Sequence, residues 1–523
     1  MVACWNEKKV CFDKSLFMVF AYSIALLTFI GVIIFWTLFH SRRVYVAPYY
    51  GRIQIDIAEA VARLSRVIQF KTISNDSVQH IDGDEFKAMH DYIEESFPLI
   101  HQYLKKEVIN EFSLLYTWEG SNPELKPMML TCHLDVVPVE PGTEKDWEFP
   151  PFQGQVTDEF VYGRGTMDVQ SGVMAILEAT EALLKQGATP ERTIYLGFGH
   201  DEEIDGEFGA REISALLEQR GVSLEFLVDE GLPVVSQLIK GVNSPVALVG
   251  VAEKGYLSIE LTAESDGGHS SVPQGKTAIA KLGEAINKLE NNPMPARIDP
   301  LARSTFYALA AAMPVPFRFI FANIWFFKGL LKRVLTSIPH TDASIRTTTA
   351  ATIFESGVKD NLIPTLARAV VNFRLHPSDT IDDVVNHVRK TIQNPEISIV
   401  CRSGFINPSK VSDTKCVAYE TVRKSIREIF PEVTVTPSLM VGATDARHYA
   451  NISERIYRFS PLRASQDDLD RVHGTNERIS IHNYTEMIQF YSRLLVHGSK
   501  INESDSAELQ IQVNQSEVET VKV

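Results

Sequence analysis

Residues 16–39 (LFMVFAYSIALLTFIGVIIFWTLF) are almost wholly apolar, and this stretch restricts the fold more than any other feature of the chain. About 20 apolar residues in a helix are enough to cross a membrane. The stretch is longer than the apolar core of a signal peptide, and no small-x-small cleavage pattern closes it. We therefore expect a retained, single-pass transmembrane anchor over residues 16–39.

The orientation of this anchor has to be read from the rest of the chain. Basic residues flank the stretch on both sides, so the flanking charges do not orient it firmly. Sequons of the type Asn-x-Ser/Thr are glycosylated in the secretory pathway. Five of them follow the anchor and together favour a lumenal (vacuole or secretory pathway) or extracellular body, with residues 1–15 in the cytosol: Asn75, Asn451, Asn483, Asn502 and Asn514.

Composition limits the number of folded units and the kinds of partner and metal site that the chain can have. The chain has 523 residues, enough for two to four folded units, and a net charge of -15. Because Lys and Arg form no long basic stripe, nucleic acid is not an expected partner. The five cysteines include no CxxC pair, which argues against a cysteine-rich zinc site. A disulfide between Cys401 and Cys416 stays open, since spacing alone cannot establish it.

The hydrophobic pattern predicts an α/β fold. Short apolar runs at 128–137, 193–199 and 224–231 are typical of buried strands, and a helix is expected between the first two, over 173–187. Another amphipathic helix is expected over 52–70. Strands that alternate with helices indicate a sheet covered on both faces. From about residue 253 the pattern changes to β-α-β-α-β, which predicts a small α+β insert.

The segment 314–335 (PVPFRFIFANIWFFKGLLKRVL) leaves two interpretations open. Aromatic and aliphatic residues are interleaved with Arg and Lys along it. It is either a helix buried in the insert or a surface that touches a membrane or a lipid-like substrate.

Residues suited to metal binding follow several of the predicted strands. The carboxyl ends of neighbouring parallel strands meet at one edge of a sheet, so these side chains should converge. Buried carboxylates repel one another unless they are paired or bind metal. A set of His and carboxylate ligands without thiolate suits zinc, with manganese or cobalt as alternatives. The candidates are His133, Asp135, Asp168, Glu202, Glu203, Asp229 and His473.

The motifs around these residues resemble the M20 metallopeptidase family. They are, in chain order, HLDVVP, GRGTMD, GHDEEIDGEFGA, VDEG, GGHSSVP, GATDAR and HGTNE. Their order and spacing are nearest to the branch of carboxypeptidase S and PM20D1 (N-fatty-acyl-amino-acid synthase/hydrolase). The resemblance implies a mixed-sheet catalytic domain flanked by helices, with a ferredoxin-like α+β lid inserted into it. The expected parts are a cytosolic N-terminus (1–15), the transmembrane anchor (16–39), a catalytic domain in two pieces (50–250 and 405–497), the lid (251–404) and a flexible tail (498–523).

The resemblance also implies residue roles in a site for two Zn²⁺ ions. Asp168 would bridge the metals, His133 and Asp229 would complete one site, and Glu203 and His473 the other. Asp135 would orient His133 through a hydrogen bond, and Glu202 would act as general base and acid. On the lid, His269, Asn361 and Arg374 would contact the substrate, and Arg447 would bind the substrate carboxylate.

The implied function is hydrolysis of an amide bond next to a free carboxylate, in an N-acyl (fatty acyl) amino acid or, alternatively, at the carboxyl end of a short peptide. The reverse synthesis is open as well. A non-catalytic binding protein on a decayed hydrolase fold is the alternative from another class. Partners implied by the resemblance are a small-molecule or short-peptide substrate and a second copy of the chain through the lid.

One departure from the family's motifs concerns substrate specificity: after the bridging aspartate many relatives have D-D-K or D-x-K, and here Gln170 replaces the lysine.

Overall fold

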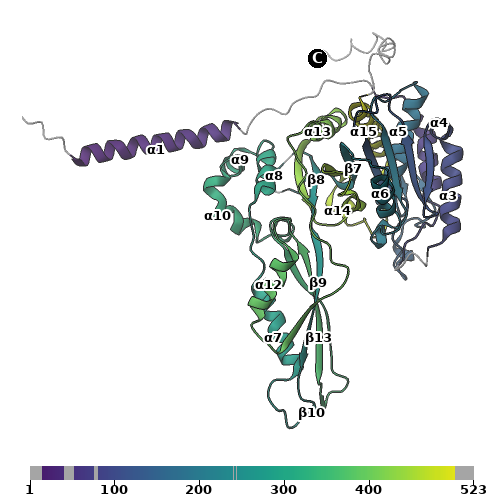
Figure 1. The fold of residues 1–523 in the computed structure, drawn as a ribbon. Helices are drawn as coiled ribbons and strands as arrows, with labels where there is room; N and C mark the ends of the chain where they lie inside the picture. Colours follow the sequence, from purple (N-terminus) through teal and green to yellow (C-terminus); the bar gives the residue numbers. More distant parts are fainter. Residues whose placement is uncertain (1–13, 40–51, 76–80, 240, 243, 501–523) are drawn as a thin grey trace, which may run out of the picture.

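The computed structural model describes residues 14–39, 52–75, 81–239, 241–242 and 244–500 (Figure 1). They form a long N-terminal helix, a larger α/β body and an elongated insert. The helix α1 (Lys14–Phe39) contains the apolar span Met18–Phe39, whose mean hydropathy is 2.5 and of which only 6% is buried. By length and composition this helix is able to cross a membrane, and an N-terminal signal sequence would have the same character.

The body is built on a mixed eight-stranded sheet. Its strand β3 (Met128–His133) is mostly apolar and is buried at every position, as expected for a strand that is covered on both faces. Across the sheet the strands are β1 (Lys105–Ile109), β2 (Ser113–Trp118), β6 (Ile194–Gly199), β3 (Met128–His133), β7 (Phe226–Val235), β16 (Ile456–Ala464), β8 (Val246–Glu253) and β15 (Thr434–Met440).

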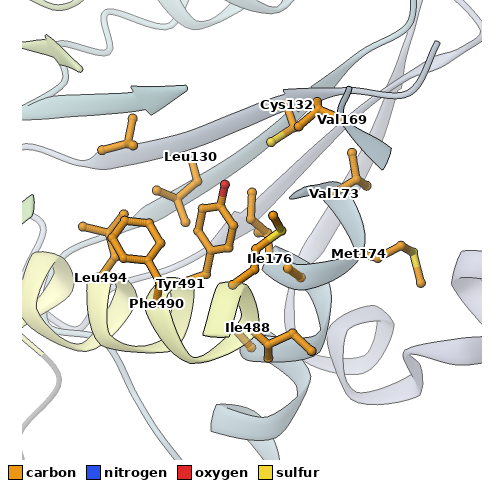
Figure 2. Close-up of a cluster of buried hydrophobic side chains, with 14 of the residues drawn as sticks. Leu130, Cys132, Val169, Val173, Met174, Ile176, Ile488, Phe490, Tyr491 and Leu494 are labelled. Carbon is orange, nitrogen blue, oxygen red and sulfur yellow. The ribbon is translucent and has the colours of Figure 1, made fainter. Parts of the chain in front are cut away.

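Helices cover both faces of this sheet. One face carries α2 (Ile57–Val67), α3 (Gly83–Ser96), α4 (Pro98–Tyr103), α5 (Gln170–Lys185), α13 (Val417–Ile429) and α15 (Ile481–Ser499), and the other carries α6 (Ala210–Gln219). Figure 2 shows α5 and α15 packed together below the sheet, with Ile176, Tyr491 and Leu130 in the shared core. This packing fixes the positions of β3 and of the first turn of α5.

Three parallel strands end at the same edge of the sheet. β3 pairs in parallel with β6, in a register that sets His133 opposite Gly199. It also pairs in parallel with β7, and Leu130 lies opposite Val228 there. The residues that follow these strands therefore share one edge, as the sequence pattern predicts.

The insert is a four-stranded antiparallel sheet with two helices on one face. Its strands lie in the order β11 (Thr348–Ser356), β13 (Leu366–Leu375), β9 (Gly255–Glu264) and β14 (Ile397–Cys401), and its helices are α7 (Ala278–Asn291) and α12 (Ile381–Ile392). This is the β-α-β-β-α-β arrangement of a ferredoxin-like unit. β9 begins at Gly255, two residues after β8 ends at Glu253.

A group of short helices packs beside the insert, on the β8–β15 edge of the large sheet: α8 (Pro300–Ala310), α9 (Val315–Ala322), α10 (Ile324–Leu335) and α11 (Pro339–Ala343). Thr305 of α8 donates a hydrogen bond to the carbonyl of Pro437 on β15 (2.7 Å). The segment 314–335 thus folds as two helices that meet at Asn323. Their buried side chains cluster with Val235 and Val246 of the body and not with the sheet of the insert.

The structure also shows the surroundings of the cysteines and of the buried sequon. Cys401 and Cys416 are both free thiols, so the disulfide left open above does not form in this structure. Asn483 is 4% exposed and its amide donates to the carbonyl of Pro461, which leaves that sequon no room for a glycan. Sequons Asn502 and Asn514, and most of the expected tail, lie outside the described residues.

Candidate metal centre

His133 is the last residue of β3, and its ring is held from one side. Its Nδ1 lies 2.9 Å from the backbone carbonyl of Asp135 and 3.3 Å from a carboxylate oxygen of the same residue. A proton on Nδ1 donated to Asp135 leaves Nε2 as the free acceptor. That nitrogen faces the carboxylates of Asp168 and Glu230, at 3.2 and 3.3 Å.

Asp168 lies between two histidines. Its Oδ1 is 3.2 Å from Nε2 of His133, and its Oδ2 is 3.0 Å from Nε2 of His473. The sequence folds this way because β5 (Phe160–Tyr162), just before the GRGTMD turn, pairs with β17 (Arg478–Ser480), just after the HGTNE turn. Each oxygen of one carboxylate therefore faces a different histidine, which is the geometry required of a ligand shared by two metals.

A buried ion pair locks these two turns together, and the sequence analysis did not identify it. Arg164 and Glu477 are 2% and 0% exposed and lie 2.7 Å apart. One oxygen of Glu477 also accepts hydrogen bonds from the backbone N–H groups of Gly165, Met167 and Asp168. The acidic residue that ends HGTNE and the arginine in GRGTMD were the available signal.

The two adjacent glutamates after β6 occupy one short turn, η3 (Glu202–Ile204). Both carboxylate oxygens of Asp135 accept hydrogen bonds from this turn, from the N–H groups of Glu202 and Glu203, each at 3.2 Å. The side chain of Glu203 reaches His473 (3.4 Å). Glu202 instead groups with His133 and Glu230, with one ligand atom of each within 4.8 Å of the others.

Asp229 and Glu230 point to different neighbours because successive residues of a strand face opposite sides. Both oxygens of Asp229 accept backbone hydrogen bonds at 2.8 Å, from Glu230 and Ala446. The carboxylate of Glu230 is the one that faces His133. Asp229 is the ligand expected from the sequence, and in the structure it is the carboxylate of its neighbour Glu230 that lies against His133.

Carboxylates crowd this edge of the sheet, and the pKa values reflect it. Burial raises the pKa of Glu202 well above its ordinary value and raises that of Asp229 to about 8. Hydrogen bonds to Asp168 and Glu203 raise the pKa of His473 to about 10. Positive charge is therefore stabilised between the carboxylates, and divalent cations would supply it.

The donor atoms fit a pair of such cations. The ligand atoms of His133, Asp168 and Glu203 lie within 4.8 Å of one another, and the group of His133, Glu202 and Glu230 lies beside them. Within the described part of the chain, Oε1 of Glu203 is buried without a hydrogen-bond partner, so it is available as a ligand. Imidazole and carboxylate donors suit zinc and, less selectively, manganese or cobalt.

A cavity of about 750 Å³ lies where the insert meets the body, and its lining includes none of the candidate metal ligands. Arg374 on β13 and Arg447 in η4 (Asp445–Tyr449), the two arginines expected to contact the substrate, both line it. The Arg374 guanidinium lies 4.9 Å from the ring centre of Tyr256, and Arg447 donates to the carbonyl of Asp205 (2.7 Å). Asp205, two residues after Glu203, lines the cavity, so one short segment of chain connects the cluster to it.

The other two predicted substrate residues lie elsewhere. His269 is in β10 (Gly268–His269), which pairs with β12 (Leu362–Ile363) at the tip of the insert, away from the body (Figure 1). Asn361 precedes β12, and its carbonyl accepts a hydrogen bond from the backbone N–H of Ser270 (3.1 Å). His269 is exposed there, and its Nδ1 accepts from the N–H of Ser271 (3.2 Å). Within one chain, neither residue lines the cavity.

Gln170, the departure noted in the sequence, is 1% exposed. Its amide donates to Oγ1 of Thr72 (3.0 Å) and to the carbonyl of Leu134 (3.2 Å). It thus ties the start of α5 to the residue that follows His133, and it does not face the cavity.

Comparisons with known proteins agree with this geometry. Residues 129–497 match the peptidase family M20/M25/M40. The chain is 41% identical to probable carboxypeptidase S-like 2 of Dictyostelium discoideum over 446 residues, which is 84% of this chain and 85% of the relative. It is 42% identical to N-fatty-acyl-amino acid synthase/hydrolase PM20D1.1 of Danio rerio over 442 residues, 83% of this chain and 85% of the relative.

Solved structures show the same fold at lower identity. The M20 family metallo-carboxypeptidase Sso-CP2 from Sulfolobus solfataricus superposes with a TM-score of 0.61 at 17% identity, over 84% of this chain and 98% of the other. The YXEP protein of Bacillus subtilis, described as a dinuclear metal-binding M20 peptidase, gives 0.53 at 14% identity, over 85% and 100%. The chain belongs to the M20/M25/M40 peptidase family and is a metallohydrolase of that family.

Proposed function

We propose that this chain hydrolyses the amide bond of N-acyl amino acids, with fatty-acyl amino acids as its main substrates, at a site that holds two zinc ions. The observation that carries this proposal is Asp168, whose two oxygens face two different histidines across a buried cluster. The relatives named for fatty-acyl amino acids support the acyl class, and those named carboxypeptidase S keep short peptides as the second candidate. An intact cluster argues against a decayed, non-catalytic fold.

The ligands would divide into two sets around Asp168. His133 and Glu230 would complete one set, with Glu230 taking the position that the sequence analysis gave to Asp229. Glu203 and His473 would complete the other. Manganese or cobalt would suit the same donors. The cations would lower the pKa of water and polarise the substrate carbonyl.

The remaining steps belong to side chains of this chain. Glu202 would accept a proton from the attacking water and later return it to the nitrogen of the leaving amino acid. Asp135 would hold both glutamates through the N–H groups of their turn and would orient His133. The free carboxylate of the substrate suits Arg374 and Arg447, because a guanidinium binds a carboxylate through two parallel hydrogen bonds.

The substrate class is tested by measuring release of the free amino acid from an N-oleoyl amino acid and from a blocked dipeptide, with the full chain and added zinc. We expect kcat/KM to be about tenfold or more higher for the oleoyl compound, since each CH₂ group of the acyl chain that leaves water on binding adds to the affinity. Release from the dipeptide alone would make the chain a carboxypeptidase.

A pair of matched substitutions tests the ligand assignment. We expect Glu230→Gln to lower metal content below two ions per chain and to reduce kcat/KM by about a hundredfold or more, as loss of a direct ligand exceeds the usual second-sphere effect. Asp229→Asn should mainly weaken the hydrogen bond that Asp229 accepts from the backbone N–H of Ala446. Metal content by mass spectrometry compares the two variants, and the opposite ranking would return the ligand role to Asp229.

We also propose that α1 is retained as the single membrane span, with residues 1–15 in the cytosol and the catalytic body lumenal or extracellular. The apolar span and its exposure support the anchor, and the sequons that follow it favour this orientation. The position of His269 and Asn361 at the tip of the insert, away from the cluster of their own chain, supports pairing with a second copy. Protease protection of sealed vesicles tests the first of these proposals, and the mass of the detergent-solubilised chain tests the second.

A further inference from the structure

The helices α9 and α10 have an exposed side that is unusually apolar for a water-facing surface. On α10, Trp325, Phe326, Leu330 and Val334 are 49, 52, 54 and 48% exposed. Phe326, Leu330 and Val334 follow one another at four-residue steps, so they form one stripe along the helix. Contiguous apolar surface of this kind marks an interaction site.

Basic residues border this stripe. Lys328 and Lys332, also four residues apart, lie on another exposed side of α10, and Arg333 follows in its last turn. Long basic side chains beside an apolar stripe are typical of helices that enter the headgroup region of a bilayer, because the stem stays in the apolar layer while the charge reaches the lipid phosphates.

α1 contacts the same helices. Phe29 lies edge-to-face with Trp325 and Phe326, with ring centres 6.0 and 5.3 Å apart. Asn323, between α9 and α10, is 0% exposed, and its amide nitrogen lies 3.0 Å from Oγ1 of Thr37 and 3.4 Å from the carbonyl of Ile33. Figure 1 shows α9 and α10 beside the C-terminal half of α1.

The depth of these contacts within a membrane follows from the geometry of α1. The span Met18–Phe39 has 22 residues, so at 1.5 Å per residue it is about 33 Å long, close to the ~30 Å apolar thickness of a membrane. Thr37 is two residues from its C-terminal end, about 3 Å, and Phe29 is ten residues from it, about 15 Å. A chain anchored by α1 therefore carries the start of α10 into the leaflet that faces the catalytic body.

We infer that α9 and α10 form a membrane-docking surface, with the apolar stripe in the acyl region of that leaflet and the basic residues at its headgroups. The occupant is the lipid bilayer. This inference rests on the proposed anchoring of α1 and adds a second, non-spanning contact. It holds the body against the membrane where fatty-acyl substrates dissolve.

The test uses the full chain with zinc, reconstituted in vesicles of phosphatidylcholine and phosphatidylserine that contain a lipid with a photoreactive acyl chain. After irradiation, labelled peptides are quantified by mass spectrometry. We expect label in Met18–Phe39 and in α9–α10. Label in α1 without label in α9–α10, or cross-linking of α10 to a second chain, would overturn the docking surface and leave the anchor standing. No label in either would overturn both.

Two valines of equal exposure provide the control. Val334 on α10 and Val108 on β1, at the opposite edge of the large sheet, are each 48% exposed. We expect Val334→Asp to reduce labelling of α10 by about tenfold, since a charge in the acyl region is strongly disfavoured, and Val108→Asp to leave it unchanged. Turnover of a water-soluble N-acetyl amino acid confirms that both variants are folded. Equal labelling in the two variants would contradict the inference.

Discussion

Replacing Glu202 by Gln is expected to lower kcat by about 10²–10⁴-fold, the usual contribution of a general base, while leaving both metals bound. The substitution keeps the size of the side chain and removes its ability to accept a proton. Its backbone N–H still donates to Asp135, so the turn that carries Glu203 should not move. Steady-state kinetics on the N-oleoyl amino acid, together with metal content, measure both parts of this expectation.

Glu212→Gln provides the control, because Glu212 is exposed on α6. It makes the same chemical change away from the cluster, and we expect wild-type kinetics. For Glu202→Gln, a higher KM with unchanged kcat would mean that Glu202 binds substrate and moves no proton. Loss of a metal ion from that variant would instead make Glu202 a ligand, which its place beside His133 and Glu230 allows.

Much of the fold was predictable because its signals are local. The apolar runs that became β3, β6 and β7 are bounded by polar or glycine residues, and parallel pairing brings their ends together. His133 and Asp135 could be placed on that edge from the period of a strand alone. Asp168 could be placed by another local signal, the glycine-rich turn that ends two residues before α5 begins. These positions depend on residues within a few places of each other.

The choice between Asp229 and Glu230 was not predictable in this way. They are neighbours on β7, both are acidic, and a shift of one residue exchanges the sides that they face. The register against β3, with Leu130 opposite Val228, decides which carboxylate meets His133. That register depends on packing of the whole sheet, so the motif alone does not contain the answer.

The break at Asn323 has a similar cause. Hydrophobic periodicity runs through residues 314–335 without a strong interruption, which favoured one continuous element. In the structure the amide nitrogen of Asn323 donates hydrogen bonds to the carbonyl of Phe319 and to Oγ1 of Thr37 on α1. The partner is nearly 300 residues away in the chain, and no local pattern indicates such a contact.

Glu477→Gln is the second substitution with a large expected effect. Glu477 contacts no substrate in this proposal, and it acts only by holding the turn that carries Asp168 in place. The amide oxygen of Gln can still accept from Gly165, Met167 and Asp168, so the variant isolates the loss of charge. Arg164 then stays buried without its ion-pair partner, which typically costs about 3–5 kcal/mol. We expect Tm to fall by roughly 5 °C or more. Metal affinity should weaken about 10–100-fold, because the turn that carries Asp168 loses its anchor.

Two controls separate this effect from general damage. Glu107→Gln removes an exposed ion pair with Arg220 of similar distance (2.7 Å), and such surface pairs contribute less than about 1 kcal/mol. Arg164→Met in the Glu477→Gln background removes the unpaired charge, and we expect it to restore part of the lost stability. If Glu477→Gln melts with the wild type and keeps both metals, the charge of Glu477 has no role in holding the cluster. If stability falls but metal affinity does not, the ion pair supports the fold independently of Asp168, and the two turns are held by β5 and β17 alone.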